Sequence, residues 1–161
     1  MSKELATGAL KEGDRAPAFR MPTDSAGEIS SAALKGKSYV LYFYPKDDTS
    51  GCTKEAIAFT AAKKKFDALG IEIVGVSKDT ATSHDKFKTK HKLKITLASD
   101  PEKETAEAYG VWVLKTLYGR KYMGMDRATF LVDAKGVIRQ IWRKVKVPGH
   151  VEAVLVAAKT L

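Results

Sequence analysis

The sequence contains only one cysteine, Cys52, among 161 residues, and it also lacks long hydrophobic runs. A single cysteine cannot build a structural disulfide framework. No apolar stretch approaches the length of a membrane span, and the first 14 residues contain no apolar segment of the kind that a secretory signal requires. We therefore expect a protein of a reducing compartment, the cytoplasm, with no attachment to a membrane.

Patterns for metals, nucleotides and repeats are also missing. The three histidines, His84, His91 and His150, do not have the spacing of metal ligands. There is no Gly-rich loop that could cradle a phosphate, no internal repeat and no low-complexity tract. We expect neither a metal nor an organic cofactor.

The chain carries a formal net charge of +9, which invites a nucleic-acid interpretation. The lysines, however, recur as on solvated helix faces, and paired Cys/His ligands and Gly-aromatic strand motifs are absent. We expect no specific nucleic acid as a partner, although weak attraction to polyanions or acidic proteins is compatible with the charge. The lysines concerned are Lys63, Lys64, Lys65, Lys86, Lys88, Lys90, Lys92 and Lys94.

The length of the chain predicts one domain over residues 1–161, with residues 1–11 as a loose N-terminal arm. Apolar residues make up 44% and charged residues 29% of the chain, which is ordinary for a globular protein.

The most informative stretch is 38–59, SYVLYFYPKDDTSGCTKEAIAF. Its first seven residues have the apolar and aromatic composition of a strand packed on both faces, and Pro45 ends that strand. From Thr49 or Ser50 the pattern changes to helical spacing, with Gly70 available to end the helix. The spacing therefore predicts a strand joined to a long helix.

Further elements follow in order along the chain. We expect a hairpin around 24–29, a helical turn over 30–34, strands at 71–77 and 95–99, helices from 79–82 to about 91 and from 102 to about 109, a hairpin of 128–132 with 137–142, and a last helix from about 149. Residues 110–125 show no clean period and are predicted as loop with strand propensity. The strand, helix, strand order makes the first two central strands parallel, and the whole predicts an α/β fold with a mixed sheet and helices on both faces.

The junction between the predicted strand before Pro45 and the long helix places Cys52 in the first turn of that helix. Backbone N–H groups there are unpaired and the helix dipole is positive, so a thiolate is favoured over a thiol. A lone cysteine is more often an inert core residue. A core cysteine does not, however, need the sequence PKDDTSG directly before it.

These residues carry a family resemblance. The pattern Pro45-x-x-x-Thr49-x-x-Cys52 resembles the active site of the peroxiredoxins, and YFYPKDDTSGCTKEA is similar to the peroxiredoxin Q, or bacterioferritin comigratory protein, branch. GDRAPAF, YMGMDRATFLVDAKGVI and VPGHVEAVL resemble the same branch in the same order, over roughly residues 11–155. Ser50 stands where the branch usually has Pro.

The resemblance implies a thioredoxin-like fold and a thiol-dependent peroxidase. Cys52 would attack hydrogen peroxide or an alkyl hydroperoxide, with Thr49 and Arg127 as catalytic partners. Pro45, Gly51, Thr49 and Arg127 would line the substrate site. The hydroxyl of Thr49 could also cap the helix, and Glu55 would support the arginine or the loop.

Ile57 stands where many members of the branch have a second, resolving cysteine. Without one, the sulfenic acid on Cys52 cannot form a disulfide within the chain, so an external thiol must resolve it. Thioredoxin, glutaredoxin, glutathione or another thiol could serve as reductant. The resemblance also implies a monomer.

Two alternatives remain at this point. A thiol-transfer protein on the same fold normally requires Cys-x-x-Cys, whereas Thr, Lys and Glu follow Cys52. A peroxide sensor or polyanion-binding protein would keep the fold without multiple turnovers.

Overall fold

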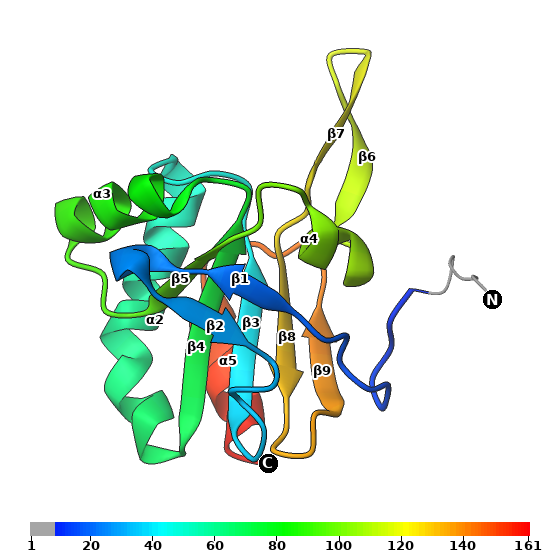
Figure 1. Ribbon diagram of the computed structural model, residues 1–161. Helices are drawn as coiled ribbons and strands as arrows, with labels where there is room; N and C mark the ends of the chain where they lie inside the picture. The colour runs from blue at the N-terminus through cyan, green and yellow to red at the C-terminus, as the bar shows by residue number, and fades with distance from the viewer. Residues whose placement is uncertain (1–8) are drawn as a thin grey trace.

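The computed structural model describes residues 9–161 (Figure 1). Its centre is a five-stranded sheet in the order β5-β4-β3-β8-β9. Strand β3 (Ser38–Phe43) pairs in parallel with β4 (Ile71–Ser77), and helix α2 (Ser50–Ala68) connects them. The predicted strand, helix, strand unit is therefore confirmed.

The other elements complete the sheet and its cover. Strand β5 (Thr96–Ser99) pairs in parallel with β4, whereas β8 (Ala128–Val132) and β9 (Ile138–Trp142) add antiparallel strands beyond β3. The remaining elements are β1 (Arg20–Pro22), η1 (Asp24–Ala26), β2 (Glu28–Ser30), α3 (Ala81–His91), α4 (Glu104–Ala108), β6 (Trp112–Leu117), β7 (Arg120–Met125) and α5 (His150–Ala158).

Side chains of β3 alternate between two hydrophobic clusters, one on each face of the sheet. Val40 and Tyr42 pack with residues of α2, α3 and α5. Leu41 and Phe43 face the second cluster, which includes residues of β1 and α4. Because helices lie on both faces of a mixed sheet, the predicted α/β class is confirmed, although the short β1–β2 hairpin provides part of the second cover (Figure 1).

Helix α2 sets the position of the cysteine. Thr49 is its N-cap residue with extended backbone angles, and Gly70 follows the helix with a φ of +72°. Cys52, Ala56, Phe59 and Phe66 are buried on the side that faces the sheet. This spacing of three and four residues is the pattern that predicted the helix.

Residues 110–125 differ most from the sequence-based expectation. They were predicted as loop with strand propensity, and most of them form the antiparallel hairpin β6–β7, which stands away from the sheet in Figure 1. Both of its faces carry apolar and charged residues, so no alternation of two marks the strands. Its turn places Tyr118 at a φ of +51°, where Asn, Asp or Gly is usual.

Helix α4 is shorter than predicted, since it begins at Glu104 rather than near residue 102. The carboxylate of Asp100 accepts hydrogen bonds from the backbone N–H groups of Thr105 and Ala106. These bonds fix where the helix starts, and Lys103 takes a left-handed conformation before it.

The expected N-terminal arm falls mostly on residues 1–8, which lie outside the described range. Of the rest, Leu10 packs against the second cluster, and its carbonyl accepts a hydrogen bond from Arg143 at 3.3 Å.

Candidate active site

Cys52 is the third residue of α2 and lies at the carboxyl end of β3. Its side chain is only 1% exposed. The first hydrogen bond of the helix runs from the N–H of Thr53 to the carbonyl of Thr49, at 2.8 Å. The preceding N–H groups of the first turn have no partner within the helix, so the sulfur lies where negative charge is stabilised.

Arg127 approaches this sulfur from the other side of the fold, 75 residues along the chain. Its Nη2 donates to Cys52 Sγ at 3.4 Å. Arg127 directly precedes β8, and its carbonyl accepts a hydrogen bond from the N–H of Val145. The fold therefore brings these two residues together and puts a fixed positive charge against the sulfur.

Glu55 holds the same guanidinium one helical turn after Cys52. Its Oε1 accepts from Arg127 Nη1 at 2.6 Å, and the side chain is 0% exposed. Burial raises the pKa of Glu55 to about 7, although Arg127 acts in the opposite direction. Glu55 therefore holds the guanidinium of Arg127 beside the sulfur.

Gly51 leaves space for the arginine. A Cβ atom at this position would lie 3.1 Å from Arg127 Nη2, which is tighter than an ordinary van der Waals contact. Since the guanidinium is held by Cys52 and Glu55, it has little freedom to move aside. A residue with a side chain would press on the group that contacts the sulfur.

Thr49 does not cap α2 with its side chain, so that part of the prediction is wrong. Its Oγ1 instead donates to the carbonyl of Lys46 at 2.8 Å. The hydroxyl thus bonds back to the loop, three residues earlier in the chain, and makes no hydrogen bond to a first-turn amide of α2. Thr49 is exposed and Pro45 is half-buried at the entrance to the loop.

A buried network that the sequence analysis did not identify holds the loop from behind. Asp47 accepts hydrogen bonds from the Tyr44 hydroxyl at 2.6 Å and the Ser83 hydroxyl at 2.8 Å, and contacts His84 Nδ1 at 2.7 Å. His84 Nε2 lies 2.9 Å from the carbonyl of Ala98. The imidazole of His84 therefore lies between the Asp47 carboxylate and the carbonyl of Ala98, and this links the loop to α3 and β5 inside the protein.

The neighbouring Asp48 contacts the same helix at its surface. Its carboxylate binds Lys90 Nζ at 2.7 Å and His91 Nε2 at 2.8 Å. Two consecutive aspartates therefore tie the loop to α3. The pair of consecutive aspartates was the only sign of these contacts in the sequence, and nothing local indicated which helix the two carboxylates would contact.

His150, at the start of α5, lies under the same end of the sheet. Its Nε2 is 2.7 Å from Thr129 Oγ1. Burial and the charge of Arg127 lower the pKa of His150 to about 4, so the imidazole is neutral at pH 7. His150 therefore adds no second positive charge that would repel Arg127.

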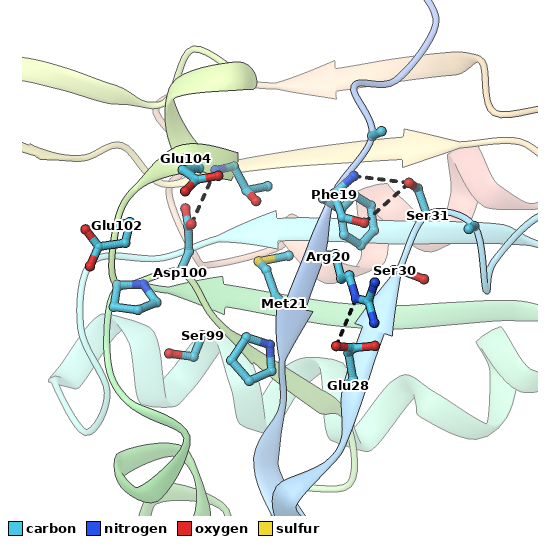
Figure 2. Close-up of a pocket in the computed structure, with 15 residues that line it drawn as sticks. Phe19, Arg20, Met21, Glu28, Ser30, Ser31, Ser99, Asp100, Glu102 and Glu104 are labelled. Atoms are coloured by element: carbon cyan, nitrogen blue, oxygen red, sulfur yellow. Dashed lines mark hydrogen bonds and ion pairs between the residues drawn. The ribbon is translucent and has the colours of Figure 1, made fainter.

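A large hollow lies away from this site. It measures about 840 Å³ and is on the opposite face of the sheet, between the β1–β2 hairpin and the segment from Ser99 to Thr105. Figure 2 shows its wall, with the Arg20–Glu28 ion pair on one side and Asp100 beneath α4. The polar groups there serve the fold, and none of them contacts Cys52.

Residues 12–141 match the AhpC/TSA family. The chain belongs to that family. Among curated relatives, it is 47% identical over 147 residues to the putative peroxiredoxin bcp of Coxiella burnetii, covering 91% of this chain and 97% of that protein. It is 44% identical over 152 residues to peroxiredoxin Bcp of Bacillus subtilis, covering 94% and 97%.

Solved peroxiredoxin structures are similar over most of the chain. Peroxiredoxin Q of Xanthomonas campestris has a TM-score of 0.85 at 40% identity, covering 88% of this chain and 90% of that one. Xylella fastidiosa PrxQ has a TM-score of 0.90 at 32% identity, covering 95% and 98%. These neighbours confirm the thioredoxin-like fold that the resemblance implied.

The peroxiredoxin differs from its X. campestris relative in cysteine content. Solved forms of that relative include Cys→Ser variants at two positions, so it has at least two cysteines, whereas this chain has only Cys52. In residues 9–161, no group of three or more His, Cys, Asp or Glu side chains could hold a metal ion. Over the same residues, no helix is both long enough and apolar enough to span a membrane.

Proposed function

We propose that this peroxiredoxin is a one-cysteine thiol peroxidase that reduces hydrogen peroxide and alkyl hydroperoxides. The thiolate of Cys52 attacks the terminal oxygen of the peroxide, and the O–O bond breaks as the S–O bond forms. The products are a sulfenic acid on Cys52 and an alkoxide or hydroxide, which takes a proton to leave as alcohol or water.

The contact between Arg127 Nη2 and Cys52 Sγ, at 3.4 Å, carries this proposal. A guanidinium at that distance stabilises the attacking thiolate. It also stabilises the charge that develops on the departing oxygen. The contact with Glu55 keeps the guanidinium of Arg127 in place, so this group needs little reorganisation during the reaction.

Thr49 has a narrower role in this scheme than the resemblance alone suggested. Its only proton is donated to the carbonyl of Lys46, so Oγ1 has lone pairs left to accept a hydrogen bond. We propose that Thr49 Oγ1 accepts a hydrogen bond from the O–H group of the bound hydroperoxide. Pro45 and Gly51 would shape the opening, Pro45 by lacking an N–H that could compete and Gly51 by lacking a side chain.

An apolar hollow of about 470 Å³ next to the first turn of α2 favours organic peroxides. Its lining includes the polar residues Ser50, Lys54 and Glu152, and the rest of it is Gly51, Ala58, Val147, Pro148, Gly149 and Val151. An alkyl chain placed there would leave its hydroperoxide end near Cys52. An X. campestris bacterioferritin comigratory protein, a related structure, is described in terms of alkyl peroxide reduction.

The cycle closes through an external thiol, because the chain has no second cysteine. A thiol attacks the sulfenic sulfur to give a mixed disulfide and water, and a second thiol then releases Cys52. Thioredoxin, glutaredoxin or glutathione would supply such thiols in a reducing cytoplasm.

Peroxide consumption under excess dithiothreitol tests the proposal. The protein should consume many equivalents of hydrogen peroxide or tert-butyl hydroperoxide, and Cys52→Ser should consume none while keeping its circular dichroism spectrum. Consumption that stops after one equivalent would identify a sensor. Turnover that survives in Cys52→Ser would overturn the proposal.

A further inference from the structure

The β6–β7 hairpin exposes a concentration of large apolar side chains that is unusual for this molecule. Five of the nine large hydrophobic residues exposed in the described chain lie on it or at its turn. Tyr118 at the tip is 95% exposed. The others are Leu114, Leu117, Tyr122 and Met123. Apolar side chains gathered on one projecting element indicate an interaction surface.

The turn of the hairpin is also strained. Tyr118 and Gly119 have φ values of +51° and +76°, as in a two-residue type I′ turn. For a bulky residue this left-handed conformation is unfavourable, and the exposed ring gains no packing within the chain in return. Strain of this kind concentrates at functional positions.

The hairpin is purely basic. From Trp112 to Met125 it carries Lys115, Arg120 and Lys121 and not a single Asp or Glu. At the base of the hairpin, Lys144 and Asp126 line one hollow beside Leu114 and Tyr122, and Lys115 Nζ lies 3.8 Å from the Asp126 carboxylate. The positive charge that Asp126 does not offset is therefore that of Arg120 and Lys121, next to the tip. A partner that complements this surface must be acidic and must also offer apolar contacts.

The hairpin lies at the same end of the sheet as Cys52. Phe43, the last residue of β3 before the active-site loop, pairs with Ala128 at the start of β8. Strand β7 ends at Met125, two residues before Arg127, which contacts the sulfur. Figure 1 shows the hairpin projecting beyond that end of the sheet. A protein bound to the hairpin would therefore lie beside the active site.

We propose that the β6–β7 hairpin is the docking surface for an acidic protein reductant that carries a Cys-x-x-Cys dithiol. This inference rests on the proposed peroxidase function and names the partner of its reducing half. One partner thiol displaces the sulfenic oxygen of Cys52 as water and forms a mixed disulfide. The second partner thiol then attacks that disulfide, which frees Cys52 as a thiolate and oxidises the partner by two electrons.

The order of side chains along the hairpin disfavours a lipid surface. Cross-strand neighbours share a face, so the pair Leu114 and Met123 lies inboard of the pair Thr116 and Lys121. Insertion into a bilayer would bury Lys121 before the apolar pair reached hydrocarbon. A second copy of this chain is disfavoured as well, because two basic hairpins and a net charge of +9 would repel each other.

The test compares two reductants on charge-reversed variants. Arg120→Glu/Lys121→Glu should lower kcat/KM for an acidic thioredoxin about tenfold, yet change turnover with dithiothreitol less than about twofold. Leu114→Ser/Met123→Ser should act in the same direction. The matched control is Lys64→Glu/Lys65→Glu, which makes the same charge change on the exposed far half of α2 and should leave both rates unchanged.

Each outcome separates this inference from the proposed function. If kcat/KM for thioredoxin fell equally in the Lys64→Glu/Lys65→Glu control, net charge alone would explain the effect, and the hairpin would not be the docking surface. The docking surface would also be overturned by unchanged kinetics in both hairpin variants, hairpin-dependent binding to phosphatidylglycerol vesicles without an effect on thioredoxin kinetics, or hairpin-dependent dimerisation in sedimentation. If the unmodified protein did not turn over peroxide with dithiothreitol as reductant, the peroxidase proposal itself would be wrong.

Discussion

At the scale of single residues, Arg127 is a half-buried positive charge in contact with the sulfur of Cys52. It contacts both Cys52 and Glu55, and burial alone would lower its pKa, but those two partners keep its pKa above the ordinary value. The guanidinium therefore stays charged in a half-buried position. The sulfur has no other cationic partner within hydrogen-bond distance in residues 9–161.

Arg127→Ala should lower kcat/KM for peroxide by about 10²–10³-fold, since a preorganised donor to the reacting atoms is removed. Alkylation of Cys52 by iodoacetamide at pH 7 should also slow, because the thiolate loses its nearest cation. Stopped-flow peroxide consumption and alkylation rates measure the two effects. An unchanged alkylation profile would show that the arginine does not act on the sulfur.

Gly51→Ala tests the space around that guanidinium. The added Cβ would meet Arg127 Nη2 at 3.1 Å, and we expect activity to fall roughly tenfold through displacement of the arginine. Alanine is the better helix former by about 1 kcal/mol, so the midpoint of thermal unfolding should not fall in parallel. If activity and stability declined together, general damage to α2 would be the better explanation.

The pH dependence of stability contains two opposing contributions. Burial raises the pKa of Glu55 from 4.5 to about 7, so the folded state binds the extra proton and Glu55 favours folding less as pH rises through that range, by roughly 3 kcal/mol. The lowered pKa of His150, from 6.5 to about 4, works the other way, because the unfolded state binds its proton first as pH falls. Between about pH 4.5 and 6.5 these two slopes offset each other.

Glu55→Gln should therefore make the protein lose stability on acidification from pH 6.5 to 4.5, where the unmodified chain changes little from these two groups. The reciprocal variant, His150→Asn, should gain stability over the same interval. Urea unfolding at a series of pH values measures both. Parallel curves for Glu55→Gln and the unmodified protein would contradict the raised pKa of Glu55.

At the scale of elements, the active-site loop is held by α3 rather than by α2 alone. Asp47 reaches Ser83 and His84 inside the protein, and Asp48 reaches Lys90 and His91 at the surface. Buried contacts of this type are costly to break on one side only, whereas exposed ion pairs contribute little.

Two neighbouring substitutions separate these contributions. Asp47→Asn should destabilise the fold by about 3–4 kcal/mol, because three donors lose a charged acceptor in a buried place. Asp48→Asn should cost no more than about 1 kcal/mol, and asparagine also tolerates the φ of +60° at this position. Urea denaturation compares the two. Equal losses would mean that the buried network does not hold the loop.

At the scale of the whole molecule, the single cysteine fixes the oxidation products. Peroxide without reductant should add one oxygen to the chain, followed by a second and a third as sulfinic and sulfonic acids form, because no internal thiol captures the intermediate. A small thiol should divert the first product to a mixed disulfide. Intact-mass spectrometry resolves these species, and a form two hydrogens lighter without added mass would contradict external resolution.

The sequence by itself determined the local elements and the placement of Cys52 in the first turn of a helix. The strand before Pro45, the helix with Cys52 in its first turn and the strand after Gly70 are all confirmed, because periods of two and 3.6 residues and the chemistry of caps are local properties. The lone cysteine likewise excludes an internal disulfide whatever the fold, since a disulfide needs two thiols. Arg127 was predicted only through the family pattern, because nothing local ties it to Cys52.

Tertiary structure decided which distant groups meet. The contacts of Arg127 with Glu55, of Asp47 with His84 and of Thr49 with Lys46 depend on how a loop closes and how elements pack, and no short period encodes them. The β6–β7 hairpin was predicted only as loop with strand propensity, for a related reason. Apart from its base, where Met125 is buried and Trp112 packs against the second cluster, most of the hairpin is exposed, so its side chains do not follow the inside-outside alternation from which a strand is predicted.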